Sequence, residues 1–117
     1  MFLELAHTKQ PVFAQSKKLI VECYKVTNTF PTSEKYALVQ QMNRAAVSVH
    51  LNIAEDCSRR SGVERKRFFE IARRSVIELD TAVGVACELG YIKPNDVNSL
   101  GQSIIGCFKQ LTGMIGA

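Results

Sequence analysis

Histidines and carboxylates are the side chains of this sequence that could bind a metal ion or catalyse proton transfer, but their spacing favours neither role. His7 precedes the first helical pattern, and His50 has no second ligand one helical turn further along. The carboxylate pairs in 55–56 and 78–80 lack the Glu-x-x-His spacing of di-iron helical bundles. No glycine-rich phosphate loop is present either. We therefore predict no catalytic residue, no metal and no cofactor, and hence a protein that is not an enzyme.

The four cysteines are about 20 to 34 positions apart, so no two have the close spacing of a metal site. Three of them fall on apolar stripes of predicted helices, where a reduced thiol behaves as a small hydrophobe. Reduced cysteines indicate a reducing compartment. The sequence starts without a signal-peptide pattern, and no apolar run approaches the roughly 20 residues that span a membrane. We therefore expect a cytoplasmic protein with no membrane contact. The four residues are Cys23, Cys57, Cys87 and Cys107.

Positive charge is concentrated between residues 59 and 74. Seven basic residues there oppose only Glu64 and Glu70, a net charge of +5 where the whole chain has +4. Such an excess can bind phosphate groups in a salt-sensitive way that is largely independent of nucleotide sequence. Alternatively, these cations only surround a solvated helix start, where they oppose the helix dipole and water screens them. The seven candidates are Arg59, Arg60, Arg65, Lys66, Arg67, Arg73 and Arg74.

A second polar feature lies close to this basic segment. Asn52 and Glu55 interrupt an otherwise apolar helix end, and Glu78 follows Arg74 by four residues. These side chains could simply form a solvated face with weak surface pairs. With Arg44 they could instead form a partly buried polar network that sets helix register or a subunit contact.

Apolar residues recur at steps of three and four along most of the chain, which is typical of helices. Pro11 suits a first helical turn, Ser61-Gly-Val-Glu64 has the form of a capping box, and Gly90 suits a helix end. Short connections between helices predict an all-α, antiparallel up-down-up-down four-helix bundle. Residues 1–117 then form a single domain, with residues 1–10 as a loose arm. The expected helices cover about 11–30, 33–57, 61–89 and 95–115.

The expected core follows two especially regular stripes. In the second helix the stripe contains Val39, Met42, Ala46, Val49 and Ile53. In the third helix it contains Phe68, Ala72, Ser75, Leu79, Ala82, Ala86 and Leu89.

Residues spread over about 12–112 resemble a known protein family. The most specific part is Asn52-Ile-Ala-Glu55 followed by Arg59-Arg-Ser61. Further matching residues are Phe30-Pro31, Glu34, Tyr36, Leu38, Gln41, Arg44-Ala-Ala, Ser48-Val49, Glu64, Phe68, Ile71-Ala72, Ser75, Glu78-Leu79, Thr81 and Leu89-Gly-Tyr-Ile92. Together they resemble the 23S rRNA intervening-sequence proteins. A more distant likeness is to the accessory protein of diversity-generating retroelements, a basic pentamer that works with a reverse transcriptase and nucleic acid.

The resemblance implies an antiparallel four-helix bundle that assembles into a ring-like homopentamer, often encoded within bacterial 23S rRNA genes, and no catalytic activity. The chain departs from the family pattern after Glu55, where Asp56, Cys57 and Ser58 replace a glycine-rich turn. Loss of the glycine predicts that the second helix continues further before the chain turns.

Taken together, these observations predict a homo-oligomeric, non-enzymatic bundle whose basic corner between the second and third helices contacts RNA or DNA. The main alternative is a protein-interaction scaffold without a nucleic-acid role, in which the same arginines pair with acidic residues of a neighbouring subunit. A small-molecule or metal site inside the bundle or a pore is a third alternative with little support in the sequence.

Overall fold

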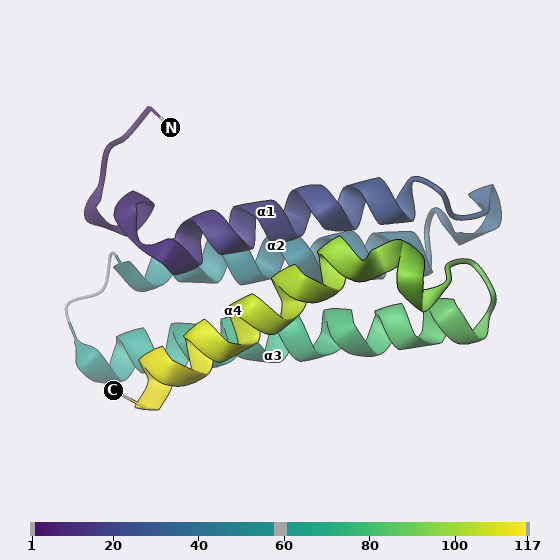
Figure 1. The fold of residues 1–117 in the computed structure, drawn as a ribbon. Coiled ribbons are helices and arrows are strands. Elements are labelled where there is room, and N and C mark those ends of the chain that lie inside the picture. The colour runs from purple at the N-terminus through teal and green to yellow at the C-terminus, as the bar shows by residue number, and fades with distance from the viewer. Residues whose placement is uncertain (1, 58–60, 117) are drawn as a thin grey trace.

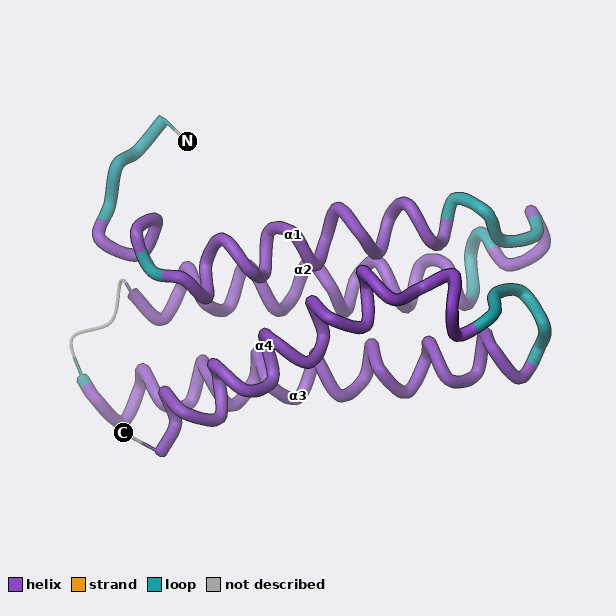
Figure 2. The backbone as a smooth tube through the Cα atoms, in the orientation of Figure 1, coloured by secondary structure: helices purple, strands orange, loops and turns teal. Residues whose placement is uncertain are grey.

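The computed structural model describes residues 2–57 and 61–116, and this part of the chain is helical without strands (Figure 2). The predicted all-α four-helix fold is confirmed. Three short 3-10 helices accompany the main helices: η1 (Ala6–Lys9), η2 (Thr32–Glu34) and η3 (Pro94–Val97). The main helices are α1 (Pro11–Thr27), α2 (Leu38–Cys57), α3 (Gly62–Glu88) and α4 (Asn98–Gly116).

Each main helix packs against two others, in the pairs α1–α2, α2–α3, α3–α4 and α1–α4. The result is an elongated bundle of 44 × 30 × 23 Å. Figure 1 shows the α1–α2 and α3–α4 connections at one end, which we call the connection end. Both chain ends and the start of α3 lie at the other end, which we call the terminal end.

The core confirms most of the predicted α2 stripe, because Met42, Ala46, Val49 and Ile53 are fully buried. These residues recur every three or four positions and therefore share the face that α1 and α3 cover. None of the helices in the described residues is long and apolar enough to cross a membrane.

The predicted α3 stripe is correct in its middle and wrong at both ends. Ala72, Leu79 and Ala86 are fully buried, but Phe68 is only half-buried and its neighbour Phe69 is buried in its place. Leu89 is exposed because it follows the last helical residue and caps the helix instead of continuing it.

Local signals place the ends of α3. The Ser61 hydroxyl accepts a hydrogen bond from the Glu64 amide at 3.4 Å, which is one half of the predicted capping box. At the other end Gly90 has a φ of +79°, a left-handed conformation that favours glycine. The Tyr91 amide donates to the Ala86 carbonyl and the Gly90 amide to the Cys87 carbonyl, the pair of bonds that defines a Schellman motif.

The second helix begins later than predicted. Thr32 and Ser33, the expected caps, open the short η2 turn instead, and α2 starts at Leu38, whose amide donates to Glu34 Oε2 at 3.3 Å. The other oxygen of Glu34 accepts a hydrogen bond from the Tyr91 hydroxyl at 3.3 Å. Glu34 therefore links the α1–α2 connection to the α3–α4 connection at the connection end of the bundle. At its other end α2 reaches Cys57, as the missing glycine predicted.

Similarly, η3 precedes the last helix. Asn95 and Asp96, the expected caps of this helix, lie within η3, and α4 starts at Asn98. Within the predicted arm, residues Ala6–Lys9 form η1, which packs against α1 and α2.

Candidate nucleic-acid interface

The basic residues predicted to bind phosphate fall into three groups, of which the first faces outward. Lys66, Arg67 and Arg74 are exposed on the first half of α3. Arg67 and Arg74 are seven residues apart and share one side of α3, whereas Lys66 lies about 100° round the helix from Arg67, on the adjoining side. Among the described residues, none of the three forms an ion pair with a carboxylate. Their charge is therefore available to an external anion.

The second group is engaged with the chain's own side chains. Arg73 Nη1 donates a hydrogen bond of 3.4 Å to Thr112 Oγ1 of α4. Arg65 interacts electrostatically with the carboxyl group of Asp56, which is buried at the end of α2. Burial raises the pKa of Asp56, and the Arg65 guanidinium lowers it to a smaller extent. Part of the positive charge predicted for external phosphate is thus directed toward the bundle itself.

The third group, Arg59 and Arg60, lies outside the described residues.

In the described part of the basic segment, Glu70 is exposed between the cations of the first group, one turn after Lys66 and one turn before Arg74. We call Lys66, Arg67 and Arg74 the α3 cations. They stand near the terminal end, where α3 begins (Figure 1).

The α3 cations face outward because the opposite face of the helix is anchored in the core. Phe69, Ala72 and Val76 are buried one turn apart and fix the rotation of α3 about its axis. Arg67 and Arg74 lie two residues before and five residues after Phe69, on the side of the helix away from that buried face, whereas Lys66, three residues before Phe69, lies at its edge and is exposed. The buried apolar residues of α3 therefore determine which of its basic residues are exposed to solvent.

Of the predicted polar network, the structure shows hydrogen bonds around Asn52. Its side-chain amide donates to the Ser48 carbonyl at 2.8 Å and to Ser48 Oγ at 3.1 Å. Ser48 Oγ lies 3.0 Å from Ser75 Oγ of α3, so the two hydroxyls join the helices directly. Ser48 and Ser75 were not among the predicted network residues. The signal for them was that both are small polar residues on helix faces that pack together.

The other three predicted network residues, Arg44, Glu55 and Glu78, are exposed. Glu55 nevertheless takes part in an interaction. Arg44 projects from the outer face of α2 into an open groove of about 730 Å³. Sequence reasoning missed this groove because its lining combines residues of α1, α2 and the turn before α2. We call it the α2 groove, lined by Tyr24, Lys35, Tyr36, Arg44, Val47 and Leu51 among others.

A serine–histidine pair that the sequence did not reveal links α1 and α2. Ser16 Oγ lies 2.6 Å from His50 Nδ1, and the His50 ring packs against the Phe13 ring, tilted by 38° with centroids 4.4 Å apart. Ser16 is fully buried, and its hydroxyl is also within 3.0 Å of the Phe13 carbonyl. A substrate cannot reach a hydroxyl in this position, so the pair packs two helices together and does not form a nucleophile with its base.

The cysteines have the surroundings predicted for inert thiols. Cys23 and Cys107 are free and buried, and burial raises the pKa of each thiol to about 12. Cys87 is free and half-buried. The side chain of Cys57 lies outside the described residues. Within the described part of the chain, no three histidine, cysteine or acidic residues are placed to hold a metal ion.

Comparison with known proteins agrees with the fold. The family model described as 23S rRNA-intervening sequence protein matches residues 8–113. Among solved structures, the chain is similar to a protein of unknown function from the S23 ribosomal protein family of Bacteroides thetaiotaomicron VPI-5482. That similarity has a TM-score of 0.83 at 19% sequence identity and covers 91% of this chain and 96% of the other. A search of curated proteins finds no match. On the extent of the family match, this chain belongs to the 23S rRNA-intervening sequence protein family.

Proposed function

We propose that this protein is a non-enzymatic, self-associating helical bundle that binds RNA or DNA through the α3 cations. The observation that carries the proposal is the cluster of Lys66, Arg67 and Arg74 on one exposed surface without carboxylate partners among the described residues. The family description, which refers to a sequence within 23S rRNA, supports a role close to RNA.

The chemistry of the surface favours phosphate over bases as the target. The cluster contains two guanidinium groups, which can bind phosphate oxygens in a bidentate manner, and one flexible ammonium group. The start of α3 adds the positive end of its helix dipole nearby. No tyrosine or tryptophan lies among the α3 cations, Phe69 is buried in the core and Phe68 is half-buried, so stacking on bases has little support. Binding should therefore depend on salt and discriminate poorly between nucleotide sequences.

The experiment is a titration of fluorescently labelled structured RNA and of duplex DNA, followed by anisotropy at several salt concentrations. The affinity should fall as salt rises. Replacing the α3 cations together by glutamine should weaken binding of all tested sequences to a similar degree. It should also reduce the slope of log affinity against log salt by up to about 3, because each lost phosphate contact on duplex DNA removes about 0.9.

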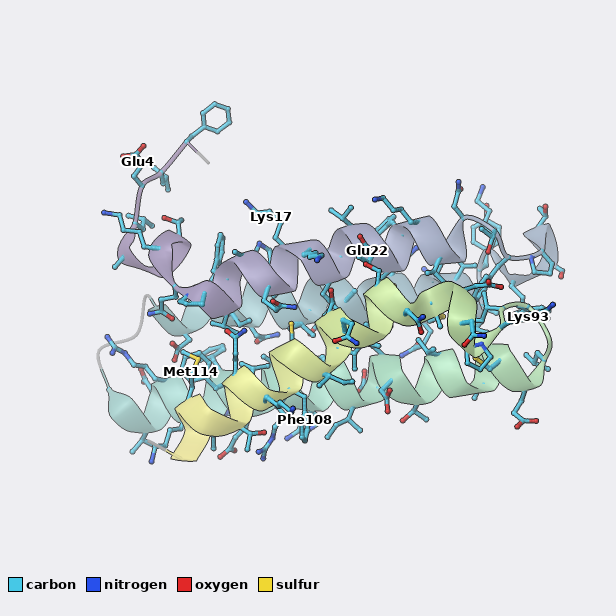
Figure 3. All side chains as sticks on the ribbon, in the orientation of Figure 1. Glu4, Lys17, Glu22, Lys93, Phe108 and Met114 are labelled. Atoms are coloured by element: carbon cyan, nitrogen blue, oxygen red, sulfur yellow. The ribbon has the colours of Figure 1, made fainter. Side chains whose placement is uncertain are left out.

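The matched control removes the same charge elsewhere. Lys17 and Lys18 on α1 and Lys93 in the α3–α4 connection are exposed and form no ion pair among the described residues, and Figure 3 shows Lys93 at the connection end. Replacing these three lysines by glutamine should leave most of the affinity. Equal losses in the two triple variants would mean that net charge alone attracts the nucleic acid. No binding at low salt, or an affinity that ignores ionic strength, would refute the proposal.

The α2 groove favours a second candidate function, that of a protein-interaction scaffold. The groove is largely apolar, and contiguous exposed apolar surface on a soluble protein marks an interaction site. In such a scaffold the α3 cations would pair with acidic residues of a neighbouring subunit, so replacing them would change the sedimentation mass and leave any nucleic-acid affinity unaffected.

A further inference from the structure

The α2 groove carries charge of one sign only. Its apolar wall includes Val47 and Leu51, and exposed tyrosines extend it. The charged side chains that line it are Lys35 and Arg44, both positive. An occupant of complementary chemistry therefore has apolar side chains together with an acidic group.

A second depression lies between α3 and α4 and differs in this respect. It measures about 320 Å³, and its apolar lining includes Ile77 and Ile105. Its charged lining residues are Asp80 and Lys109, one of each sign. Charge therefore selects no occupant for this depression, whereas it does for the α2 groove.

Residues 2–5 provide the complementary chemistry within the same chain. Phe2, Leu3 and Leu5 are 89%, 67% and 48% exposed, and Glu4 is the charged residue among them. Figure 3 shows Glu4 on a segment that leaves the bundle at the terminal end, well away from the four helices. The segment also precedes the residues that the family model matches, so the fold of the family does not account for it. We call residues 2–5 the N-terminal segment.

We propose that the N-terminal segment of one copy docks in the α2 groove of a second copy. In an extended segment alternate side chains share a face, so Leu3 and Leu5 enter the groove together. Glu4, between them, points to the opposite side and lies over the open side of the groove, where one cation of the rim, Arg44 or Lys35, can reach its carboxylate. This inference gives a molecular basis to the self-association named above and rests on that part of the proposed function.

The geometry favours a second copy over the segment's own groove. Four residues span at most about 14 Å when fully extended. The groove extends along α2 from Leu51 to Val39, which is about 18 Å at 1.5 Å per residue, and continues to Tyr36. The Tyr36 end lies toward the connection end, whereas the segment leaves the bundle at the terminal end (Figure 1). Arg44 lies thirteen residues, about 20 Å, before the end of α2 at the terminal end, which is farther than the chain's own segment extends, whereas a segment from another copy can reach it.

The test compares masses by light scattering during size-exclusion chromatography over a range of protein concentrations. The unmodified chain should elute as a multiple of its 13.0 kDa mass. Deleting residues 2–5 should weaken self-association at least tenfold without loss of helical circular dichroism, because the segment lies outside the core. The double substitution Leu3→Ser with Leu5→Ser should have the same effect. The matched control is Ile77→Ser with Ile105→Ser, which removes two exposed side chains from the other depression and should leave the mass unchanged.

A charge exchange tests the predicted contact itself. Glu4→Arg and Arg44→Glu should each weaken self-association, and the combined variant should recover part of it. An unchanged mass after deletion of residues 2–5, or a loss of mass only in the Ile77/Ile105 control, would overturn the inference. So would a chain in which Arg44→Glu lowers nucleic-acid affinity and leaves the mass intact, because the groove would then bind nucleic acid.

The two proposals can fail separately. A protein that stays at 13.0 kDa at every concentration would disprove self-association and this inference together. It would leave nucleic-acid binding by the α3 cations to its own salt titration.

Discussion

Replacing glycine by alanine at Gly84 and at Gly90 should have opposite effects on the stability of the fold. Gly84 lies inside α3, whereas Gly90 follows its end with a φ of +79°. A Cβ atom added at either position meets no heavy atom within 4 Å. Steric clashes are therefore absent at both sites, and the difference must come from backbone conformation.

The magnitudes follow from helix propensity and from the left-handed conformation. Gly84→Ala should stabilise the fold by about 0.8–1 kcal/mol, the propensity difference between the two residues in a helix interior. Gly90→Ala should destabilise it by about 1–2 kcal/mol, because an L-residue is strained at positive φ. A chain of 117 residues has an unfolding entropy of about 0.25 kcal/mol per kelvin, so 1 kcal/mol corresponds to about 4 °C in Tm.

Thermal and urea unfolding followed by circular dichroism measure both effects, at two protein concentrations so that self-association is accounted for. We expect Tm to rise by about 4 °C for Gly84→Ala and to fall by about 4–8 °C for Gly90→Ala. Gly90→Asn is the control, since asparagine tolerates the left-handed region and should lose less. Shifts of the same sign in the two alanine variants would refute the assignment of Gly90 as the helix-ending residue.

Two further predictions concern contacts between and within the helices. A double-mutant cycle with Ser48→Ala and Ser75→Ala, read from urea unfolding, should give a coupling energy of about 0.5–1.5 kcal/mol, and a value near zero would mean that the hydroxyls do not stabilise each other. Because burial raises the pKa of Cys23 and Cys107 to about 12 from an ordinary value of 9.0, the folded state holds protons that the unfolded state releases. The contribution of the two protonated thiols to the free energy of unfolding should therefore be fully present below about pH 9 and be lost as pH rises toward 12. The Cys23→Ala/Cys107→Ala variant should lose less stability over the same range.

The periodic parts of the fold could be predicted from sequence because burial there depends on spacing alone. Met42, Ala46, Val49 and Ile53 are all fully buried, as their steps of three and four residues indicated. The glycine at the end of α3 was equally readable, because few residues other than glycine tolerate its conformation.

The helix ends and the choice between neighbouring residues were harder to predict because they depend on tertiary contacts. Phe68 and Phe69 are adjacent and identical in type, so only the packing of α3 decides which one is buried. The start of α2 depends on Glu34, whose carboxylate bonds to the Leu38 amide and to the hydroxyl of Tyr91, 57 residues away. No local pattern contains that second contact.

For the candidate site, the sequence located the basic segment but could not sort its members. Lys66, Arg67 and Arg74 face outward, while Arg73 contacts Thr112 and Arg65 influences Asp56. That division depends on which side of α3 meets α4 and the end of α2. It needs the rotation of the helix in three dimensions and could not be obtained from charge counts.

The cations at the beginning of α3 also have a consequence for how this protein could evolve or be engineered. Positive side chains beside the amino-terminal end of a helix are electrostatically unfavourable for folding, by up to about 1 kcal/mol in the first turn and by less at Lys66 and Arg67, which lie in the second turn of α3. A selection that rewards heat resistance alone would tend to exchange Lys66 and Arg67 for glutamate and so remove the surface that we propose binds phosphate. Variants that gain melting temperature there while losing affinity would reveal a residue retained for its partner at the expense of the fold.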